Sequence, residues 1–279
     1  MTPILCDHAR AMEKAYKNSD FLMGREARPL RILSEYLEPQ ARFARYKVAD
    51  TVVFFGSARA LPIELAEEAL VNAKATGNPS SIARAEGGIR LARYYEDARL
   101  LARSMTEWSK SLVSPTRRYL VCSGGGPGIM EAANRGASEA HGISIGLGIS
   151  LPDEPTMNAY ITREMGFEFH YFFMRKFWFV YLAKALVVFP GGFGTMDELF
   201  ELLTLVQTRK STKRMPIILY GRQFWSEVLN FDALIRWGTI DATDLSLFHV
   251  ADTPDEAFAY LTRELSSLYG DKDTEVSSV

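Results

Sequence analysis

Short apolar runs alternate with amphipathic segments along most of this chain. The first run, Thr-Val-Val-Phe-Phe at 51–55, is continuously apolar, which predicts a strand buried on both faces of a parallel sheet. Further runs predict strands at 119–122, 143–149, 186–189, 216–220 and 248–250, with helices beginning near 129, 172, 195, 224 and 254. This alternation predicts an α/β fold built on a doubly wound parallel sheet.

Two helical segments lie outside that alternation. Residues 5–45 show helical apolar spacing, and residues 61–113 are rich in Ala, Glu, Arg and Leu with a break at Gly77-Asn78-Pro79-Ser80. We find no internal repeat or low-complexity linker. We therefore predict one α/β domain over 1–279, whose parts are a helical extension (1–48), a core (49–255) with a helical hairpin inserted at about 61–113, and a C-terminal helix with a disordered tail (256–279).

The charge and cysteine content narrow the possible partners. The chain has 32 basic and 34 acidic residues, so no global positive field favours nucleic acid. Cys6 and Cys122 are far apart, which fits a reducing compartment, and we take Cys122 as a core residue. No stretch reaches the roughly 18 apolar residues of a membrane span, and the first residues lack a signal-peptide pattern. We expect a cytoplasmic protein with no membrane partner, and the four histidines show no metal-binding spacing.

Three glycine-rich loops follow predicted strands, at the sheet edge where doubly wound proteins bind ligands. The first, Gly56–Arg59, offers the Ser57 hydroxyl and a guanidinium, although an ordinary strand-to-helix turn explains it equally well. The second, Ser123–Gly128, offers successive backbone N–H groups for an anion. Ile129 occupies the third position of G-x-G-x-x-G, which disfavours a dinucleotide. Close helix–strand packing is the alternative explanation of these glycines.

The third loop, Pro190–Glu198, carries the strongest signal. Its glycines and the helix that follows predict a site for a monophosphate, held by free N–H groups and the helix dipole without a metal. Glu198 lies about one turn into the helix, where its carboxylate could reach a sugar attached to that phosphate. The spacing of Thr195 and Glu198 also fits a capping box, with Thr195 as the helix cap.

Two cations, Arg175 and Lys176, lie within an aromatic stretch at 172–179 that we expect to be largely buried. Arg175 can make a bidentate contact with a carboxylate or a phosphate, so a pairing of Arg175 with Glu198 across the strand ends is chemically sensible. The alternative is a cation pair at the rim of a core helix.

The segments 190–198, 174–176 and 123–128 together resemble the Lonely guy (LOG) family of phosphoribohydrolases, some of which were formerly labelled lysine decarboxylases. The resemblance covers roughly 52–220 and indicates a longer bacterial-type member with a Rossmann-like fold. It implies hydrolysis of the N-glycosidic bond of cytokinin riboside 5′-monophosphate or AMP, without a cofactor, by a homodimer or a larger homo-oligomer. One departure is Glu131, which stands where compact plant-type members usually show glycine, so base preference is not carried over.

The resemblance makes Arg175 and Glu198 the catalytic pair. With the first two glycine loops included, the expected substrate- and phosphate-binding residues are Ser57, Gly125, Gly126, Asn158, Lys176, Gly191, Gly192, Phe193, Gly194, Thr195 and Thr204. One alternative is a non-catalytic carrier of a nucleotide or of molybdenum cofactor, because fold alone does not decide function. A lysine decarboxylase is a third hypothesis, although no glycine loop contains the lysine that pyridoxal phosphate needs.

Overall fold

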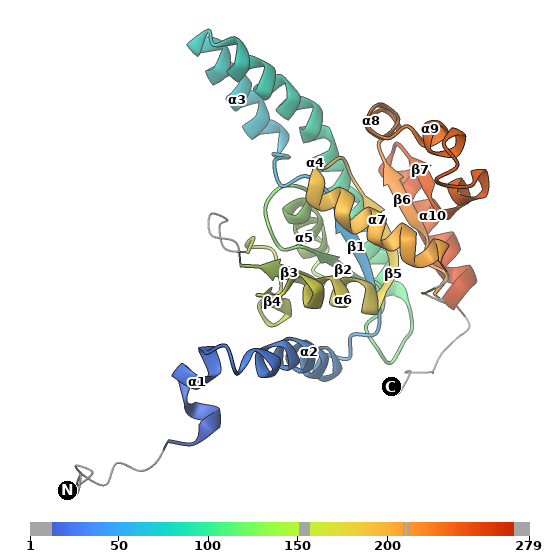
Figure 1. The fold of residues 1–279 in the computed structure, drawn as a ribbon. Helices are drawn as coiled ribbons and strands as arrows, with labels where there is room; N and C mark the ends of the chain where they lie inside the picture. Colours follow the sequence, from blue (N-terminus) through green and yellow to red (C-terminus); the bar gives the residue numbers. More distant parts are fainter. Residues whose placement is uncertain (1–12, 151–156, 209, 211–212, 271–279) are drawn as a thin grey trace, which may run out of the picture.

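The computed structural model describes residues 13–150, 157–208, 210 and 213–270. Within them lies a seven-stranded sheet in the order β4-β3-β2-β1-β5-β6-β7, in which every neighbouring pair is parallel (Figure 1). The strands are β1 (Thr51–Phe55), β2 (Leu120–Ser123), β3 (Ser144–Ile149), β4 (Gly166–Phe169), β5 (Ala183–Val188), β6 (Ile217–Tyr220) and β7 (His249–Ala251). The strand order reverses between β1 and β5, which confirms the predicted doubly wound, Rossmann-like sheet.

Helices cover both faces of this sheet. They are α1 (Ser19–Met23), α2 (Arg28–Arg45), α3 (Ile63–Thr76), α4 (Pro79–Ser111), α5 (Ile129–Glu139), α6 (Phe172–Leu182), α7 (Phe193–Gln207), α8 (Arg222–Val228), α9 (Phe231–Arg236) and α10 (Pro254–Tyr269), with 3-10 turns at Ala15–Lys17, Arg163–Met165 and Ala242–Leu247. One core lies under α4, α5 and α10, and the other lies under α2, α6 and α7. The strands between these cores are buried on both faces, as their continuous apolar runs predict.

The structure corrects the prediction at two strands. Strand β4 was not predicted, because Gly-Phe-Glu-Phe is short and its exposed Glu168 interrupts the apolar run. Strand β5 begins at Ala183 rather than at residue 186, because the polar Lys184 lies within it. The C-terminal helix begins at Pro254, as its sequence pattern predicts, and the Thr253 side chain accepts a hydrogen bond from the N–H of Glu256. The predicted tail at 271–279 and residues 1–12 of the predicted extension lie outside the described residues.

The aromatic stretch before β5 is less buried than its sequence predicts. It forms α6, which buries Met174, Trp178 and Phe179 against the sheet. On its other side Phe172 and Phe173 are 51% and 52% exposed. Helix α6 is therefore a half-exposed helix at the rim of the core rather than a buried one. No helix in the described ranges is long and apolar enough to cross a membrane.

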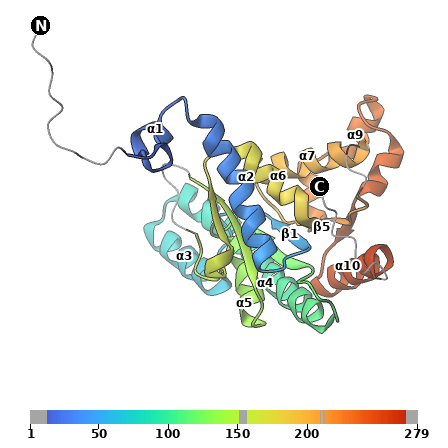
Figure 2. The same ribbon diagram turned by 90° about the horizontal axis from the view of Figure 1, so that it is seen from below.

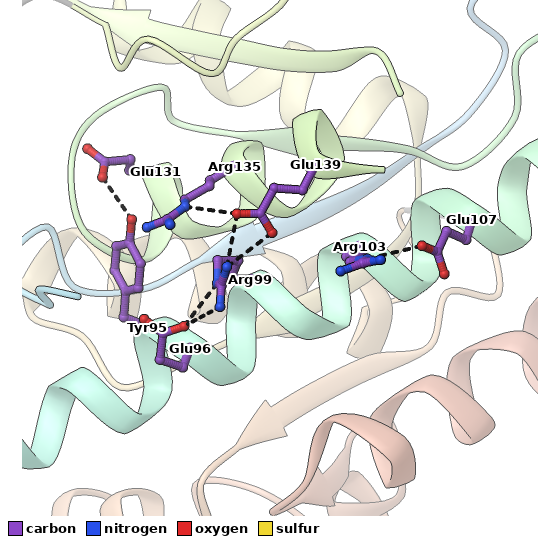
Figure 3. A network of polar contacts seen from close by, with 8 residues as sticks. All are labelled: Tyr95, Glu96, Arg99, Arg103, Glu107, Glu131, Arg135 and Glu139. Atoms are coloured by element: carbon purple, nitrogen blue, oxygen red, sulfur yellow. Dashed lines mark hydrogen bonds and ion pairs between the residues drawn. The ribbon is translucent and has the colours of Figure 1, made fainter. Parts of the chain in front are cut away.

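The predicted helical hairpin is α3 with α4, inserted between β1 and β2, and its tip projects beyond the sheet (Figure 1). The C-terminal part of α4 packs on α5 through a polar network drawn in Figure 3. The Tyr95 hydroxyl donates to Glu131 Oε1 at 2.8 Å, and Arg99 bridges Glu96 to Glu139. Because Glu131 lies in the first turn of α5, the hairpin fixes the start of the helix that follows the second glycine loop.

Tyr95→Phe is expected to lower the free energy of unfolding by about 1–3 kcal/mol, because it removes a buried hydroxyl donor from a carboxylate. Urea unfolding measures the change. Glu107→Gln is the matched control, since it alters a more exposed pair with Arg103 on the same helix and should shift stability by about 0.5 kcal/mol or less. Equal stability of Tyr95→Phe and wild type would show that the bond to Glu131 does not hold the hairpin.

Candidate active site

The three glycine loops meet at the carboxyl ends of β1, β2 and β5. The N–H of Ser57 donates to the carbonyl of Pro190 at 2.9 Å, and the carbonyl of Ser57 accepts from the N–H of Ile129 at 3.0 Å. Gly128 has a φ of 73°, and a Cβ there would lie 2.2 Å from the Ser57 carbonyl oxygen. Glycine is therefore required for the second loop to approach the first, and Ser57 joins all three loops.

A cleft of about 1140 Å³ opens over these loops. The first loop contributes residues 56–59 to its walls, the second contributes 124–126, and the third with the start of α7 contributes 192–198. Other lining residues come from more distant elements: Leu91, Met130, Met157, Glu168, Phe172, Arg175, Val228 and Leu229. The arrangement offers backbone N–H groups, two guanidinium groups and several carboxylates to one ligand.

The second loop is held from behind by a buried amide network. Asn158 Nδ2 donates to the carbonyls of Gly125 and Gly126, each at 3.0 Å, and to Asn134 Oδ1 at 3.0 Å. The Ser123 hydroxyl donates to the same Asn134 oxygen at 2.7 Å. Asn158 therefore supports the loop rather than lining the cleft. Sequence reasoning missed Asn134, although a polar residue on the apolar face of α5 is a signal that could have found it.

The third loop enters α7 without a side-chain cap. The helix begins at Phe193 with Gly192 as its N-cap, and no side-chain cap hydrogen bond is formed there. Thr195 lies inside the helix, so the predicted capping box with Glu198 is wrong. A Cβ at Gly191 would lie 2.1 Å from Thr195 Oγ1, so glycine at 191 leaves room for the threonine side chain. The N–H groups of the first turn are thus not taken up by a side-chain cap.

Glu198 lies in the second turn of α7 and is only 8% exposed. Burial raises the pKa of its carboxyl from 4.5 to about 7, against the opposing effect of the cations Arg175 and Lys176. Asp197 and Glu201 on the same helix raise it slightly further. A carboxyl with this pKa can give up or accept a proton near neutral pH, as a general acid or base requires.

Arg175 reaches the cleft from α6, the helix that precedes β5. Its Nε donates to the carbonyl of Leu147 at 2.8 Å, and its guanidinium carbon lies 5.1 Å from the centroid of the Phe179 ring. A Cβ at Gly124 would lie 2.7 Å from one terminal nitrogen of Arg175. The guanidinium therefore occupies space that glycine leaves at the second loop, and it lines the same cleft as Glu198.

Most of the predicted binding residues line the cleft: Ser57, Gly125, Gly126, Gly192, Phe193, Gly194 and Thr195. Lys176 lies outside the described lining, where its Nζ pairs with Asp197 Oδ2 at 2.7 Å and Glu201 Oε2 at 2.9 Å. Thr204 is exposed, and its hydroxyl donates to the carbonyl of Phe200 on its own helix. Lys176, Thr204, Asn158 and Gly191 are thus not brought into contact with the cleft.

Several lining residues were missed by sequence reasoning. Glu168 was hidden because β4 was not predicted, and its Oε1 accepts a hydrogen bond from the Ser150 hydroxyl at 2.7 Å. Leu91 lies on the inserted hairpin, and Leu229 follows α8, so nothing in their local sequence indicated a place at the cleft. Within the described ranges, no group of three or more His, Cys, Asp or Glu side chains could hold a metal ion.

Comparison with known proteins finds a matching family model and several similar proteins. Residues 130–261 match the model of a family described as "possible lysine decarboxylase". Over 145 residues the chain is 26% identical to the probable cytokinin riboside 5′-monophosphate phosphoribohydrolase LOG4 of Oryza sativa subsp. japonica, an alignment that covers 51% of this chain and 62% of the rice protein. Over 121 residues it is 31% identical to the pyrimidine/purine nucleotide 5′-monophosphate nucleosidase of Escherichia coli (strain K12), covering 38% of this chain and 25% of that protein.

Two solved structures are also similar. TM1055 is 21% identical with a TM-score of 0.47, and the match covers 77% of this chain and 99% of that one. The molybdenum cofactor carrier protein of Chlamydomonas reinhardtii is 18% identical with a TM-score of 0.42, and the match covers 78% of this chain and 98% of that one. The chain spans less than two thirds of the length of either curated relative.

Proposed function

We propose that this chain hydrolyses the N-glycosidic bond of nucleoside 5′-monophosphates, because residues 130–261 match the family described as possible lysine decarboxylase and the relatives include a probable phosphoribohydrolase and a nucleotide nucleosidase. The products are a free base and ribose 5-phosphate. The observation that carries the proposal is Glu198, a buried carboxyl with a pKa of about 7 in the same cleft as Arg175 and the glycine loops. Cytokinin riboside 5′-monophosphate and AMP are the proposed substrates.

In the proposed mechanism the phosphate binds the N–H groups at the start of α7, which fixes the ribose over the second turn of that helix. As the bond from C1′ to the base nitrogen breaks, C1′ gains oxocarbenium character, and the ionised Glu198 stabilises it. Water attacks C1′ and gives a proton to the Glu198 carboxylate, while the base leaves with the bonding electron pair and takes up a proton from solvent. Glu198 then returns its proton to solvent. Arg175 holds the phosphate or orients the carboxylate.

The rate of hydrolysis should depend on the ionisation of Glu198. Below its pKa the carboxyl is protonated and cannot accept a proton from water, so kcat/KM for AMP is expected to rise with pH and level off above about 7. Initial rates between pH 5 and 9 measure this profile. A rate that is flat across that range would remove Glu198 as the base.

The proposed activity is tested by chromatography of the protein incubated with AMP, other nucleoside monophosphates and isopentenyladenosine monophosphate. Release of free base and ribose 5-phosphate is expected, and the relative rates rank the bases. Tight nucleotide binding with no release of base would instead favour the non-catalytic carrier. We further propose a homodimeric or larger assembly, which sedimentation of the purified protein tests. We also propose a cytoplasmic location, which fractionation of cells tests.

The residues of the cleft do not fit pyridoxal phosphate. A decarboxylase of that class attaches its cofactor to a lysine amine, and the described lining contains no lysine. Lys176, a neighbour of the cleft, is held in ion pairs with two carboxylates. The described residues of the cleft therefore do not support lysine decarboxylation with pyridoxal phosphate, although the matching family is described as possible lysine decarboxylase.

A further inference from the structure

The N-terminal helix α2 lies beside α6, the helix that carries Arg175 (Figure 2). Both oxygens of Glu35 accept backbone hydrogen bonds at the turn before α6, from the N–H of His170 at 2.8 Å and from the N–H of Tyr171 at 3.2 Å. The backbone carbonyl of Glu35 also accepts from Trp178 Nε1 at 3.0 Å. One residue of α2 is therefore bonded to both the start and the middle of the α6 segment.

A second contact fixes α2 against the sheet edge that precedes this turn. Arg42 donates to the carbonyl of Gly166 at 2.8 Å and to the carbonyl of Glu164 at 3.2 Å, and its guanidinium carbon lies 4.1 Å from the centroid of the Phe167 ring. The edge strand β4 is thus covered by α2. Glu35 and Arg42 together hold the chain from residue 164 to 171 at two points.

The turn held by Glu35 leads directly to Arg175. Tyr171 is the N-cap of α6, and no side-chain cap hydrogen bond is formed there. The carbonyl of Tyr171 accepts the backbone N–H of Arg175 at 3.2 Å. Glu35 holds the N–H of the same residue, so it fixes the first turn in which Arg175 lies. Its negative charge also lies near the positive end of the α6 dipole, which stabilises that orientation.

We propose that Glu35 is a positioning residue that sets the orientation of α6 and thereby holds the Arg175 guanidinium in the cleft shared with Glu198. This gives the N-terminal extension a role in the site, and its kinetic consequence rests on the proposed hydrolase function. The extension thus acts on the reaction from outside the cleft, since Glu35 is not among the described lining residues.

Glu35→Gln tests the proposal with little change in shape. Glutamine has one oxygen and one NH₂, so it can satisfy only one of the two N–H groups and loses the negative charge. We expect kcat/KM for AMP to fall about 10- to 100-fold through the displacement of Arg175. Ser34→Ala is the matched control, because that hydroxyl donates to the Leu30 carbonyl of its own helix, and it should retain wild-type kinetics.

The pH dependence of Glu198 ionisation distinguishes a positioning role of Glu35 from a merely structural one. The charged groups that face it are Arg175 and Lys176 on α6 and Asp197 and Glu201 on α7. Withdrawal of the Arg175 charge removes a stabilising influence on the carboxylate, so the ascending limb of the pH–rate profile should move to higher pH in Glu35→Gln. General destabilisation would lower the rate without moving that limb.

An NMR titration of the Glu198 carboxyl tests the positioning role without a measurement of catalysis. The side-chain carboxyl ¹³C signal of Glu198, assigned by its absence in Glu198→Gln, should titrate at higher pH in Glu35→Gln than in wild type. An unchanged titration with unchanged kinetics would overturn the proposal. A shifted titration in a protein that releases no base from AMP would support the positioning role while refuting the proposed hydrolase function.

Discussion

Glu198→Gln is expected to lower kcat/KM for nucleoside monophosphate hydrolysis about 10²- to 10⁴-fold, the usual effect of losing a positioned acid–base group. Glutamine keeps the size of the side chain but cannot accept a proton from water or carry the negative charge that stabilises C1′. Nucleotide binding should persist, because the proposed phosphate contacts are made by the glycine loop rather than by this side chain. Product release followed by chromatography and binding measured by calorimetry separate the two effects.

The same variant should fold at least as well as wild type at alkaline pH. The pKa of Glu198 is about 7 in the folded protein against an ordinary value of 4.5, so folding favours the protonated form. The resulting penalty is absent below pH 4.5, grows as the pH rises, and is complete above about pH 7 at about 3 kcal/mol. Thermal unfolding at pH 8 should therefore show an equal or higher Tm for Glu198→Gln.

Glu201→Gln is the matched control for the kinetics. It removes a carboxylate of the same helix that pairs with Lys176 and lies outside the described lining of the cleft. It should change kcat/KM by no more than a few-fold. If Glu198→Gln turned over at a rate close to that of wild type, Glu198 would have no part in the mechanism.

Arg175→Ala is expected to lower kcat/KM about 10²-fold or more, because it removes a fixed positive charge from the cleft together with the Nε–H bond to the Leu147 carbonyl. It should also move the ascending limb of the pH–rate profile to higher pH, since Arg175 lowers the pKa of Glu198. Rates measured from pH 5 to 9 give both quantities.

Lys176→Ala is the companion variant. Lys176 also lowers the pKa of Glu198, but its ammonium group is paired with Asp197 and Glu201 outside the described lining. A role through these ion pairs predicts a shift of the pH profile with little change in KM, whereas direct substrate binding predicts a raised KM. Arg175→Ala with wild-type kcat/KM and an unshifted profile would contradict a catalytic role for Arg175.

The sheet could be predicted from sequence because its strands are buried on both faces and so appear as unbroken apolar runs. The run at β1 illustrates this, since all its residues are buried. Strand β4 escaped detection because it lies at the sheet edge, where Glu168 can point to solvent. The pairing of that edge with α2 could not be predicted, because helical spacing shows which face is apolar but not which element will cover it.

The candidate site was also predictable only in part, because local sequence does not show which distant segments come into contact. The rule that ligands bind at the carboxyl ends of parallel strands indicated that the three glycine loops would meet, and the hydrogen bonds of Ser57 do join them. Local sequence did not show that α7 begins two residues before Thr195, which removed the capping box. Contacts such as Glu35 with Tyr171 join segments far apart in the chain, and a motif carries no information about them.

The position of β1 at the centre of the sheet also constrains the order in which the protein can assemble. This strand is made early, but its neighbours β2 and β5 begin at Leu120 and Ala183, after the hairpin and after most of the core have been synthesised. Pairings of such long sequence separation form slowly. The third glycine loop follows β5 directly, so it acquires its bond to Ser57 only when β1 and β5 have paired. Recovery of base release during refolding should therefore report the formation of the sheet centre rather than the earlier formation of the helices.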